Sequence, residues 1–450
     1  MRARAALALP IVLMAACSSR LVEVAPPASP RAAADSAFVK SLSFSLLEDY
    51  GVGENLAGIE NDFTLMHELG ISTWRGSLGW DDLEPERGQY DFQWVHAFAE
   101  LAQRERITLR PYIGYTPKWA ALGRRGDDAY WNDPPAEPGS WVAFVGALAT
   151  QMQRHPNVAS YEIYNEPDSR IWWDGTPTEY FQVLAGASTA IRAAHPGAQV
   201  IMGGLVRPDA EWLDRMCEEF RGGPAFDVVA FHAYPETWTE DSVTVETYLD
   251  AEYHDEFAPR ADSLCGGKPI WLNELGFATA GEKTEWDQAN WWVRTIATYA
   301  ADRHIGHLGI FQLRDRPAPN PELADDPNHH LGLVRADGTR KIAFNTVQML
   351  VALLSADSLV VADAEPEIRL RSRRERELYR HLFVRPDGRQ VLILWDRRGA
   401  PTLEIRLPRG GTRAMSYDLD GTAMPVNIEA GLVRRISLQR GWARIIVVDP

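Results

Sequence analysis

The chain has 450 residues, of which 45% are hydrophobic and 24% charged, so it can bury one large core and a smaller second one. Its formal net charge of −16 disfavours nucleic acid and other polyanions as partners. No Cys/His cluster has zinc-ligand spacing, and no glycine-rich dinucleotide motif follows a predicted strand. We therefore expect neither a metal nor a cofactor.

The N-terminus carries an export signal. Residues 1–16 hold two arginines followed by an apolar stretch too short to span a membrane, which predicts a signal peptide. The letters LMAAC, ending at Cys17, resemble a bacterial lipobox, in which the cysteine is lipidated; Ser18 then favours the outer membrane. Residues 17–36 are rich in proline and alanine and predict a linker. We expect a periplasmic or outer-membrane lipoprotein of a Gram-negative bacterium, held to the membrane by its lipid anchor only. Plain cleavage near Ala16 is the alternative.

Residues 37–356 alternate short β-rich runs with longer amphipathic helical stretches, which indicates parallel βα units. Eight such units predict an α/β fold of the closed (β/α)8 TIM barrel type, whereas an open doubly wound sheet lacks its glycine motif here. The predicted strands are 42–46, 73–77, 108–113, 160–164, 199–202, 228–231, 270–273 and 309–312. The predicted helices are 59–69, 94–104, 141–154, 178–194, 211–220, 245–264, 284–302 and 343–354.

Residues 357–450 have a different texture, with short strands separated by turn residues and no helical pattern. This rhythm predicts a small antiparallel β-sandwich domain with a structural role. The predicted strands are 368–371, 379–384, 390–395, 403–407, 413–417, 432–438 and 443–448.

Two further cysteines, Cys217 and Cys265, could form a disulfide in an oxidising periplasm. Cys217 lies in a predicted helix and Cys265 just before the seventh strand. Two separate buried thiols are equally compatible with the sequence.

Two glutamates end strand-like segments in matching contexts. Glu166 lies in the letters NEPD, directly after the fourth predicted strand, and Glu274 lies in NELG after the seventh, 108 residues later. The carboxyl ends of barrel strands meet at one rim. Cleavage of an acetal needs two carboxyl groups, one to protonate the leaving oxygen and one to attack or to activate water. The pair therefore predicts an enzyme that cuts sugars.

Other polar and aromatic residues belong to the same rim. Arg75 ends the second strand, Tyr115 and Trp119 follow the third, and His232 and Tyr234 end the sixth. A local alternative for the arginine is an ion pair with Asp81 or Glu84. The convergence of these polar and aromatic residues from several strands favours a functional site.

This combination resembles the retaining (β/α)8 glycoside hydrolases of clan A. Within that clan the chain is most similar to family 39-like enzymes, including bacterial periplasmic exopolysaccharide hydrolases, from about Phe38 to the C-terminus. The resemblance rests on Arg75, on Asn-Glu-Pro at 165–167, on His-x-Tyr at 232–234, on Glu274, and on the phrases GISTWRGS (70–77), GYTPKW (114–119) and LGLVRADGT (331–339).

The resemblance implies that Glu166 is the general acid/base and Glu274 the nucleophile, acting on an oligo- or polysaccharide. Arg75 and Tyr234 can then stabilise the charge of Glu274. Asn165 would bind the sugar 2-hydroxyl, and His232 would orient the tyrosine, the acid/base or the sugar. A buried histidine bonded to a backbone carbonyl is the alternative for that position.

The eighth strand departs from the clan, whose members usually place a tryptophan there under the reactive sugar. Here the segment contains Phe311 and Gln312, and either side chain can take over; we favour Gln312 as the one that faces inward. Trp172 and Trp173, just past Glu166, are expected to form a sugar-binding wall.

Two other functions remain compatible with these residues. A transglycosidase would share every catalytic group and differ only in excluding water from the second step. A carbohydrate-binding lipoprotein with a decayed site is disfavoured, because both glutamates and their helpers are present.

Overall fold

The computed structural model describes residues 37–123, 129–220, 225–240, 242–250, 252–362, 366–370 and 377–450. The predicted signal peptide, Cys17 and the linker lie outside these residues. The anchoring and the cellular location therefore stay predictions.

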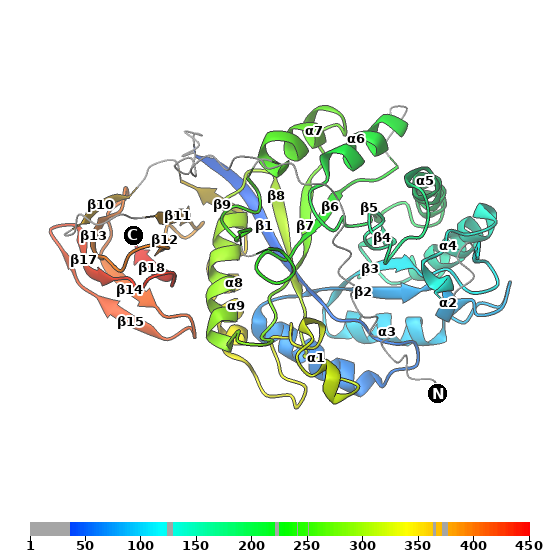
Figure 1. Ribbon diagram of the computed structural model, residues 1–450, viewed down its shortest axis with the longest axis horizontal. Coiled ribbons are helices and arrows are strands. Elements are labelled where there is room, and N and C mark those ends of the chain that lie inside the picture. The colour runs from blue at the N-terminus through cyan, green and yellow to red at the C-terminus, as the bar shows by residue number, and fades with distance from the viewer. Residues whose placement is uncertain are drawn as a thin grey trace.

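Eight parallel strands form a closed barrel, as predicted (Figure 1). Neighbouring strands pair in parallel from β1 to β5 and from β6 through β8 back to β1. Two isolated parallel bridges, Ile201 to Val228 and Leu205 to Phe231, join β5 to β6 and complete the circle. The barrel strands are β1 (Phe38–Leu47), β2 (Thr73–Gly79), β3 (Thr108–Gly114), β4 (Ser160–Ile163), β5 (Gln199–Met202), β6 (Val229–Ala233), β7 (Ile270–Leu275) and β8 (Ile305–Phe311).

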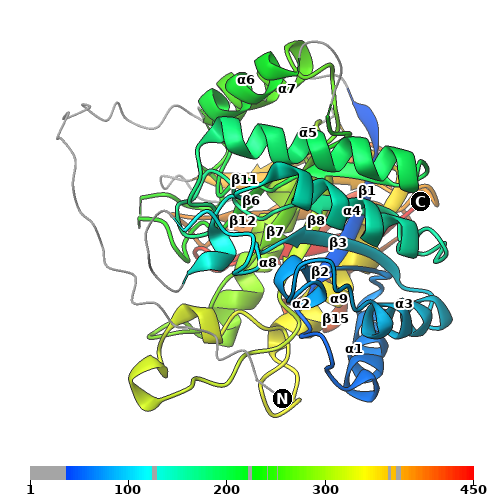
Figure 2. The ribbon, with the colours of Figure 1, turned by 90° about the vertical axis from the view of Figure 1, so that its right-hand side faces the viewer.

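The barrel strands are surrounded by helices, and Figure 2 shows several of these along the outside. The α-helices are α1 (Leu56–Leu69), α2 (Trp80–Leu83), α3 (Gln93–Arg104), α4 (Pro138–Met152), α5 (Pro177–Ala194), α6 (Ala210–Glu219), α7 (Ala258–Ser263), α8 (Glu285–Ala300) and α9 (Ile342–Leu354). Short helical turns are η1 (Tyr130–Asn132), η2 (Glu252–Phe257), η3 (Pro321–Leu323) and η4 (Pro327–His329). Among the described residues, no helix has the length and apolar character that a membrane crossing needs.

The predicted helix over residues 245–264 is wrong in its first half. Residues 245–250 form turns, and the structure describes a helix from Glu252 onward. Thr247 accepts a hydrogen bond from the backbone N–H of Thr244 through its hydroxyl. Such local side-chain bonds stabilise turns in competition with a helix, which explains the difference.

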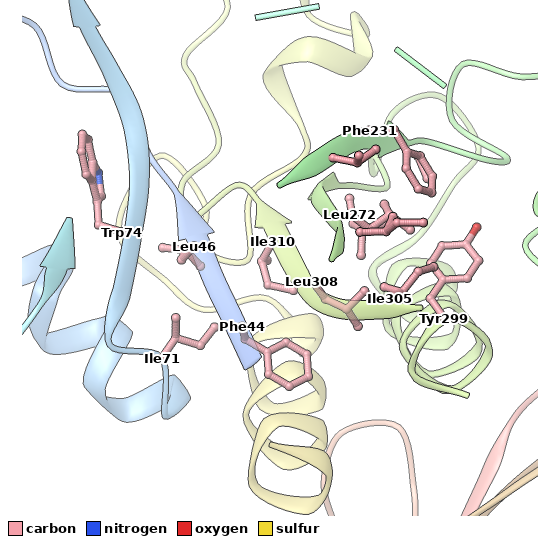
Figure 3. Packing of buried hydrophobic residues seen from close by; sticks show 14 of the residues in the cluster. Phe44, Leu46, Ile71, Trp74, Phe231, Leu272, Tyr299, Ile305, Leu308 and Ile310 are labelled. Carbon is pink, nitrogen blue, oxygen red and sulfur yellow. The ribbon is translucent and has the colours of Figure 1, made fainter. Parts of the chain in front are cut away.

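The main apolar core lies around the barrel wall. Figure 3 shows side chains from strands β1, β6, β7 and β8 packed with Tyr299 of helix α8. Successive residues of a strand face opposite ways, so the other face of the wall differs. On β1, Leu46 belongs to this core, whereas the hydroxyl of Ser45 hydrogen-bonds His307 of β8 at 2.8 Å. The inner face of the barrel is therefore partly polar, and it can carry charged groups to the rim.

The C-terminal part forms an antiparallel β-sandwich, as predicted (Figure 1). One sheet continues from β1 through β9, β11, β12, β18, β14 and β15, and the other contains β10, β13, β17 and β16. A second apolar cluster contains side chains from both sheets. The strands are β9 (Ala356–Val361), β10 (Glu367–Leu370), β11 (Leu378–Val384), β12 (Gln390–Asp396), β13 (Thr402–Arg406), β14 (Arg413–Tyr417), β15 (Ala423–Val426), β16 (Ile428–Glu429), β17 (Leu432–Ser437) and β18 (Arg444–Asp449).

The first strand of the chain belongs to both parts. Its end pairs with β2 and β8 of the barrel, while its beginning, Phe38 to Lys40, pairs antiparallel with β9. Helix α8 lies between the barrel and the sandwich and is buried on nearly all sides from Gln288 to Ala300. The shared strand and this helix fix the sandwich beside the barrel.

Cys217 of α6 and Cys265, which follows α7, form a disulfide, which settles the alternative that the sequence left open. The bond closes a loop of 48 residues on the outside of the barrel.

Replacing Cys217 and Cys265 together with serine is expected to lower the free energy of unfolding by about 2–4 kcal/mol, because the unfolded chain gains the freedom that the crosslink removes. Urea denaturation of wild type and variant measures the difference. A reductant should destabilise the wild type alone; a wild type that is insensitive to reductant would contradict the expectation.

Candidate active site

The predicted rim residues come together at the carboxyl ends of the strands. Arg75 lies in β2, His232 in β6 and Glu274 in β7, and Glu166 follows β4 by a short turn. Tyr234 lies directly after β6. The closed barrel alone brings these positions together, since they are far apart in sequence.

Both oxygens of the Glu274 carboxylate are held by hydrogen bonds. Arg75 donates to Oε1 at 2.6 Å, and the hydroxyl of Tyr234 donates to Oε2 at 2.6 Å. Glu274 is buried, so these charge-assisted bonds fix its orientation. The local ion-pair alternative for Arg75 does not hold, because its guanidinium points across the barrel.

A second buried carboxylate, Glu162 of β4, orients the arginine. Arg75 donates to both oxygens of Glu162 at 2.7 Å, and Asn273 and the backbone N–H of Gly204 donate to the same carboxylate at 2.9 and 3.0 Å. Arg75 also donates to the amide oxygen of Asn165 at 3.2 Å. A fully bonded buried carboxylate of this kind holds the guanidinium in place for Glu274.

Sequence reasoning missed Glu162 and Asn273. A signal existed for each of them. Glu162 is a charged residue inside an otherwise apolar strand, and Asn273 precedes Glu274 as Asn165 precedes Glu166.

Glu166 lies opposite Glu274 and is the more accessible of the two, with 14% of its side chain exposed against 8%. His232 connects them: its Nδ1 lies 2.7 Å from Oε1 of Glu166 and 3.4 Å from Oε2 of Glu274. Oxygens of the two glutamates approach within 4.8 Å. Retaining glycosidases separate their carboxyl groups by about 5–5.5 Å and inverting ones by about 6.5–9.5 Å, so this spacing is of the retaining kind.

The charges around the site set the protonation of its groups. Burial alone would raise the pKa of Glu274, but His232, Arg75 and the hydrogen bonds lower it below the ordinary range. Burial alone would lower the pKa of His232, but Glu274 and Glu166 raise it. Burial and the charge of Glu274 raise the pKa of Tyr234 well above its usual value, so its hydroxyl stays a donor. Ligand atoms of Glu166, His232 and Glu274 lie close enough together to hold a cation. The guanidinium of Arg75, bonded to Glu274, opposes a cation there electrostatically.

Left-handed backbone conformations occur at the rim. Tyr115 has φ of 66°, Tyr164 of 58° and Glu166 of 43°, values that are uncommon for residues other than glycine. Such conformations cost free energy and cluster at functional sites. Here these conformations follow β3 and β4, where the chain turns and brings Glu166 and the ring of Tyr115 to the rim.

The aromatic wall of the site differs from the predicted one. Trp172 is part of it, with its ring 5.7 Å from Trp131 and 6.5 Å from Tyr115. Trp173 is not, because it is only 1% exposed and packs against Tyr164 in the core. The wall is therefore the partly exposed cluster of Tyr115, Trp131 and Trp172.

Trp119 also departs from its predicted place at the sugar. Its indole donates to the backbone carbonyl of Glu84, and its ring packs edge-on against Trp80 at 5.7 Å.

At the end of β8 the structure reverses the preference for Gln312. The side chain of Gln312 is fully buried, and neither of its polar atoms has a partner among the described residues. Phe311 is partly exposed and packs edge-on against Tyr234, at 5.9 Å between ring centroids. Phe311 is thus the aromatic residue at the end of β8, and the Tyr234 ring on which it packs also contacts Trp238, at 4.4 Å.

Phe311→Ala is expected to lower kcat/KM by about one order of magnitude, if stacking on a sugar resembles other aromatic stacking. Gln312→Met is the control variant at the neighbouring position. It removes unpaired buried polar atoms at similar volume, so it should raise the melting temperature and leave the kinetics unchanged. Steady-state kinetics and thermal unfolding of both variants separate these effects. A kinetic loss confined to the Gln312 variant would restore the original prediction.

A further polar cluster adjoins Arg75 and was not predicted. The Tyr112 ring lies 4.8 Å from the guanidinium carbon, and its hydroxyl donates to both oxygens of Asp49 at 2.9 Å. Arg316, from the segment after β8, lies 3.8 Å from Asp49 and is partly exposed. These residues extend the polar lining of the rim beyond the two glutamates.

Two family models match adjoining parts of the barrel. A model described as β-galactosidase matches residues 54–124, and one described as cellulase of glycosyl hydrolase family 5 matches residues 126–312. The second match includes both Glu166 and Glu274. Both models describe glycosidases.

Solved structures share the fold over nearly the whole described chain. A family 39 glycoside hydrolase from Bacteroides cellulosilyticus WH2 superposes with a TM-score of 0.68 at 17% identity, covering 91% of this chain and 81% of that one. A family 39 β-xylosidase from Caulobacter crescentus gives 0.65 at 15% identity, covering 92% and 98%. A family 30 endoxylanase from Clostridium papyrosolvens C71 gives 0.61 at 14% identity, covering 92% and 100%.

The fold, the two glutamates at the rim and the family models together define a glycosidase, a (β/α)8 glycoside hydrolase of clan A. Enzymes of this clan retain the anomeric configuration and use two glutamates. Within the clan, the family 39 structures share this fold over 91–92% of the chain.

Proposed function

We propose that this glycosidase cleaves O-glycosidic bonds of an oligo- or polysaccharide by double displacement, with Glu274 as the nucleophile and Glu166 as the acid/base. The observation that carries the proposal is the pairing at the rim. Glu274 is held in place and ionised by Arg75 and Tyr234, and its oxygens lie within 4.8 Å of those of Glu166.

In the first step Glu274 attacks the anomeric carbon, while Glu166 gives its proton to the departing oxygen. The product of this step is a glycosyl ester of Glu274. In the second step Glu166 removes a proton from water, which attacks the anomeric carbon and frees the carboxylate. Both displacements invert, so the sugar leaves with its original configuration.

The neighbouring groups have positioning roles in this proposal. His232, bonded to Glu166 at 2.7 Å, directs that carboxyl group towards the leaving oxygen. The amide oxygen of Asn165 is taken by Arg75, so its amide nitrogen is left for the sugar 2-hydroxyl. The Tyr115, Trp131 and Trp172 wall offers flat apolar faces to further sugar rings.

The stereochemical outcome tests the mechanism. We expect net retention, because the separation of the two carboxyl groups leaves no room for a water molecule between nucleophile and sugar. NMR of the first-formed anomer decides it, using whichever p-nitrophenyl β-glycoside of xylose, glucose, mannose or galactose is cleaved fastest. An inverted first product would remove Glu274 as the nucleophile.

A further inference from the structure

A cavity of about 390 Å³ lies where the β-sandwich meets the first turn of helix α8. This volume is in the range of ligand pockets, which is about 300–1,000 Å³. Two tryptophans line it: Trp286 in α8, which is 44% exposed, and the partly exposed Trp442 in the loop before β18. The polar lining comes from Asp418, Asp420, Gln439 and Arg444 of the sandwich.

Several polar groups of the cavity are unused. Within the described part of the chain, three side-chain groups form no hydrogen bond: the indole N–H groups of Trp286 and Trp442 and the side-chain amide of Gln439. Asp420 uses its Oδ1 to accept from the backbone N–H of Thr422 at 2.9 Å. Aromatic faces surrounded by free donors and acceptors suit a pyranose ring, which has an apolar face and a rim of hydroxyl groups.

The walls of the cavity are fixed in place. Asn290 of α8 donates to the carbonyl of Gly441 and accepts from the backbone N–H of Ala443, both at 2.9 Å. Arg444, the first residue of β18, pairs with Asp418, which follows β14, so this ion pair joins two segments of the sandwich that line the cavity. A site whose walls are already held loses little freedom when a ligand binds.

The charge of the lining selects among sugars. Asp418 and Asp420 face one guanidinium, that of Arg444, so the cavity carries a net negative charge. It therefore disfavours uronates and sulfated sugars and favours neutral ones, whose hydroxyl groups can donate to carboxylates.

The position of the cavity relates it to the active site. Glu274 lies in β7, and helix α8 with Trp286 in its first turn is the next regular element. The N-terminus of a helix that follows a barrel strand lies at the same rim as the strand's carboxyl end. Thr346 of α9 donates to the carbonyl of Leu419, which places the β14–β15 turn beside the helical layer (Figure 1).

We propose that this cavity is a second carbohydrate-binding site, which takes a neutral pyranose unit of a polysaccharide and holds the polymer beside the catalytic rim. Trp286 and Trp442 supply the stacking faces, and Asp418, Asp420 and Gln439 bind the hydroxyl groups. That the sugar belongs to the polysaccharide substrate of this enzyme rests on the proposed function. That the cavity suits a neutral pyranose does not, because it rests on the residues that line the cavity.

Affinity electrophoresis tests the proposal in gels that contain mixed-linkage β-glucan, galactomannan, arabinoxylan or, as the acidic polymer, polygalacturonate. The full chain carrying Glu274→Ala is used, because this substitution is expected to abolish turnover, so that binding is measured alone. We expect retardation by at least one neutral polymer, and an apparent Kd that is about five- to tenfold weaker in Trp286→Ala and Trp442→Ala. Tyr90→Ala, an aromatic residue of similar exposure (38%) outside the cavity, is the matched control.

Retardation by none of the neutral polymers, or retardation that Trp286→Ala leaves unchanged, would overturn the site. Retardation by polygalacturonate alone would overturn the inference that the cavity prefers neutral sugars. Trp286 is exposed, so its loss should not disturb folding, and a melting curve of each variant verifies this. Failure of the proposed function is a separate result, because it would show as absent hydrolysis of p-nitrophenyl glycosides by the wild type.

Discussion

Glu274→Ala is expected to abolish turnover, lowering kcat by about four to six orders of magnitude, as removal of a covalent nucleophile does elsewhere. The variant has no carboxylate to form the glycosyl ester, while Arg75 keeps its bonds to Glu162 and stays in place. Azide can enter the vacated space and attack the anomeric carbon in a single displacement. It should restore part of the rate and give a glycosyl azide of inverted configuration.

Glu48 supplies a matched control for this substitution. It is a buried carboxyl group at the end of β1, and burial raises its pKa to about 8, so it is mostly uncharged at neutral pH. Glu48→Gln therefore keeps both shape and charge there, and it should retain activity. The assay is release of p-nitrophenol with and without azide, followed by NMR of the azide adduct. Turnover by Glu274→Ala without azide would show that another group is the nucleophile.

The barrel and the meeting of the two glutamates at its rim could be predicted because their signals are local. Each strand carries a short apolar run and each helix its own periodicity, so the order of elements is written along the chain. Glu166 and Glu274 each follow such a run directly. The rule that strand ends share one rim then supplies their proximity without any knowledge of contacts.

The supporting residues could not be predicted in the same way, because their roles depend on contacts between distant segments. Arg75 and Glu162 are 87 positions apart and meet only once the barrel closes. Trp172 and Trp173 are neighbours in sequence, yet one contacts the rim aromatics and the other packs on Tyr164 in the core. Which of two adjacent tryptophans faces the substrate is decided by the path of a loop, and no periodicity records it.

The same limit applies to the sandwich. Strand β9 was not predicted, because its residues show no clear alternation; its partners are the start of β1 and the end of β11. Pairing between segments about 320 positions apart leaves no local pattern. The cavity at Trp286 and Trp442 forms only where helix α8 meets the sandwich, so the sequence of neither segment alone predicts it.

Glu166→Ala is expected to divide substrates by their leaving groups. A 2,4-dinitrophenyl glycoside needs no proton on its departing oxygen, so formation of the glycosyl ester should remain fast. Glycosides with poor leaving groups, and the natural polymer, should lose about two to four orders of magnitude in kcat/KM, which is the usual contribution of a general acid. Hydrolysis of the ester should also slow, because water loses its base. A burst of dinitrophenol followed by a slow steady state is therefore expected.

Azide distinguishes this variant from the loss of Glu274. In Glu166→Ala the ester on Glu274 still forms, and azide attacks it from the side that Glu166 occupied. The adduct should then have retained configuration, the opposite of the adduct from Glu274→Ala. A plot of kcat/KM against leaving-group pKa, steep in the variant and shallow in the wild type, completes the test. Equal losses on activated and unactivated substrates, or adducts of the same configuration from both variants, would contradict the division of roles between the two glutamates.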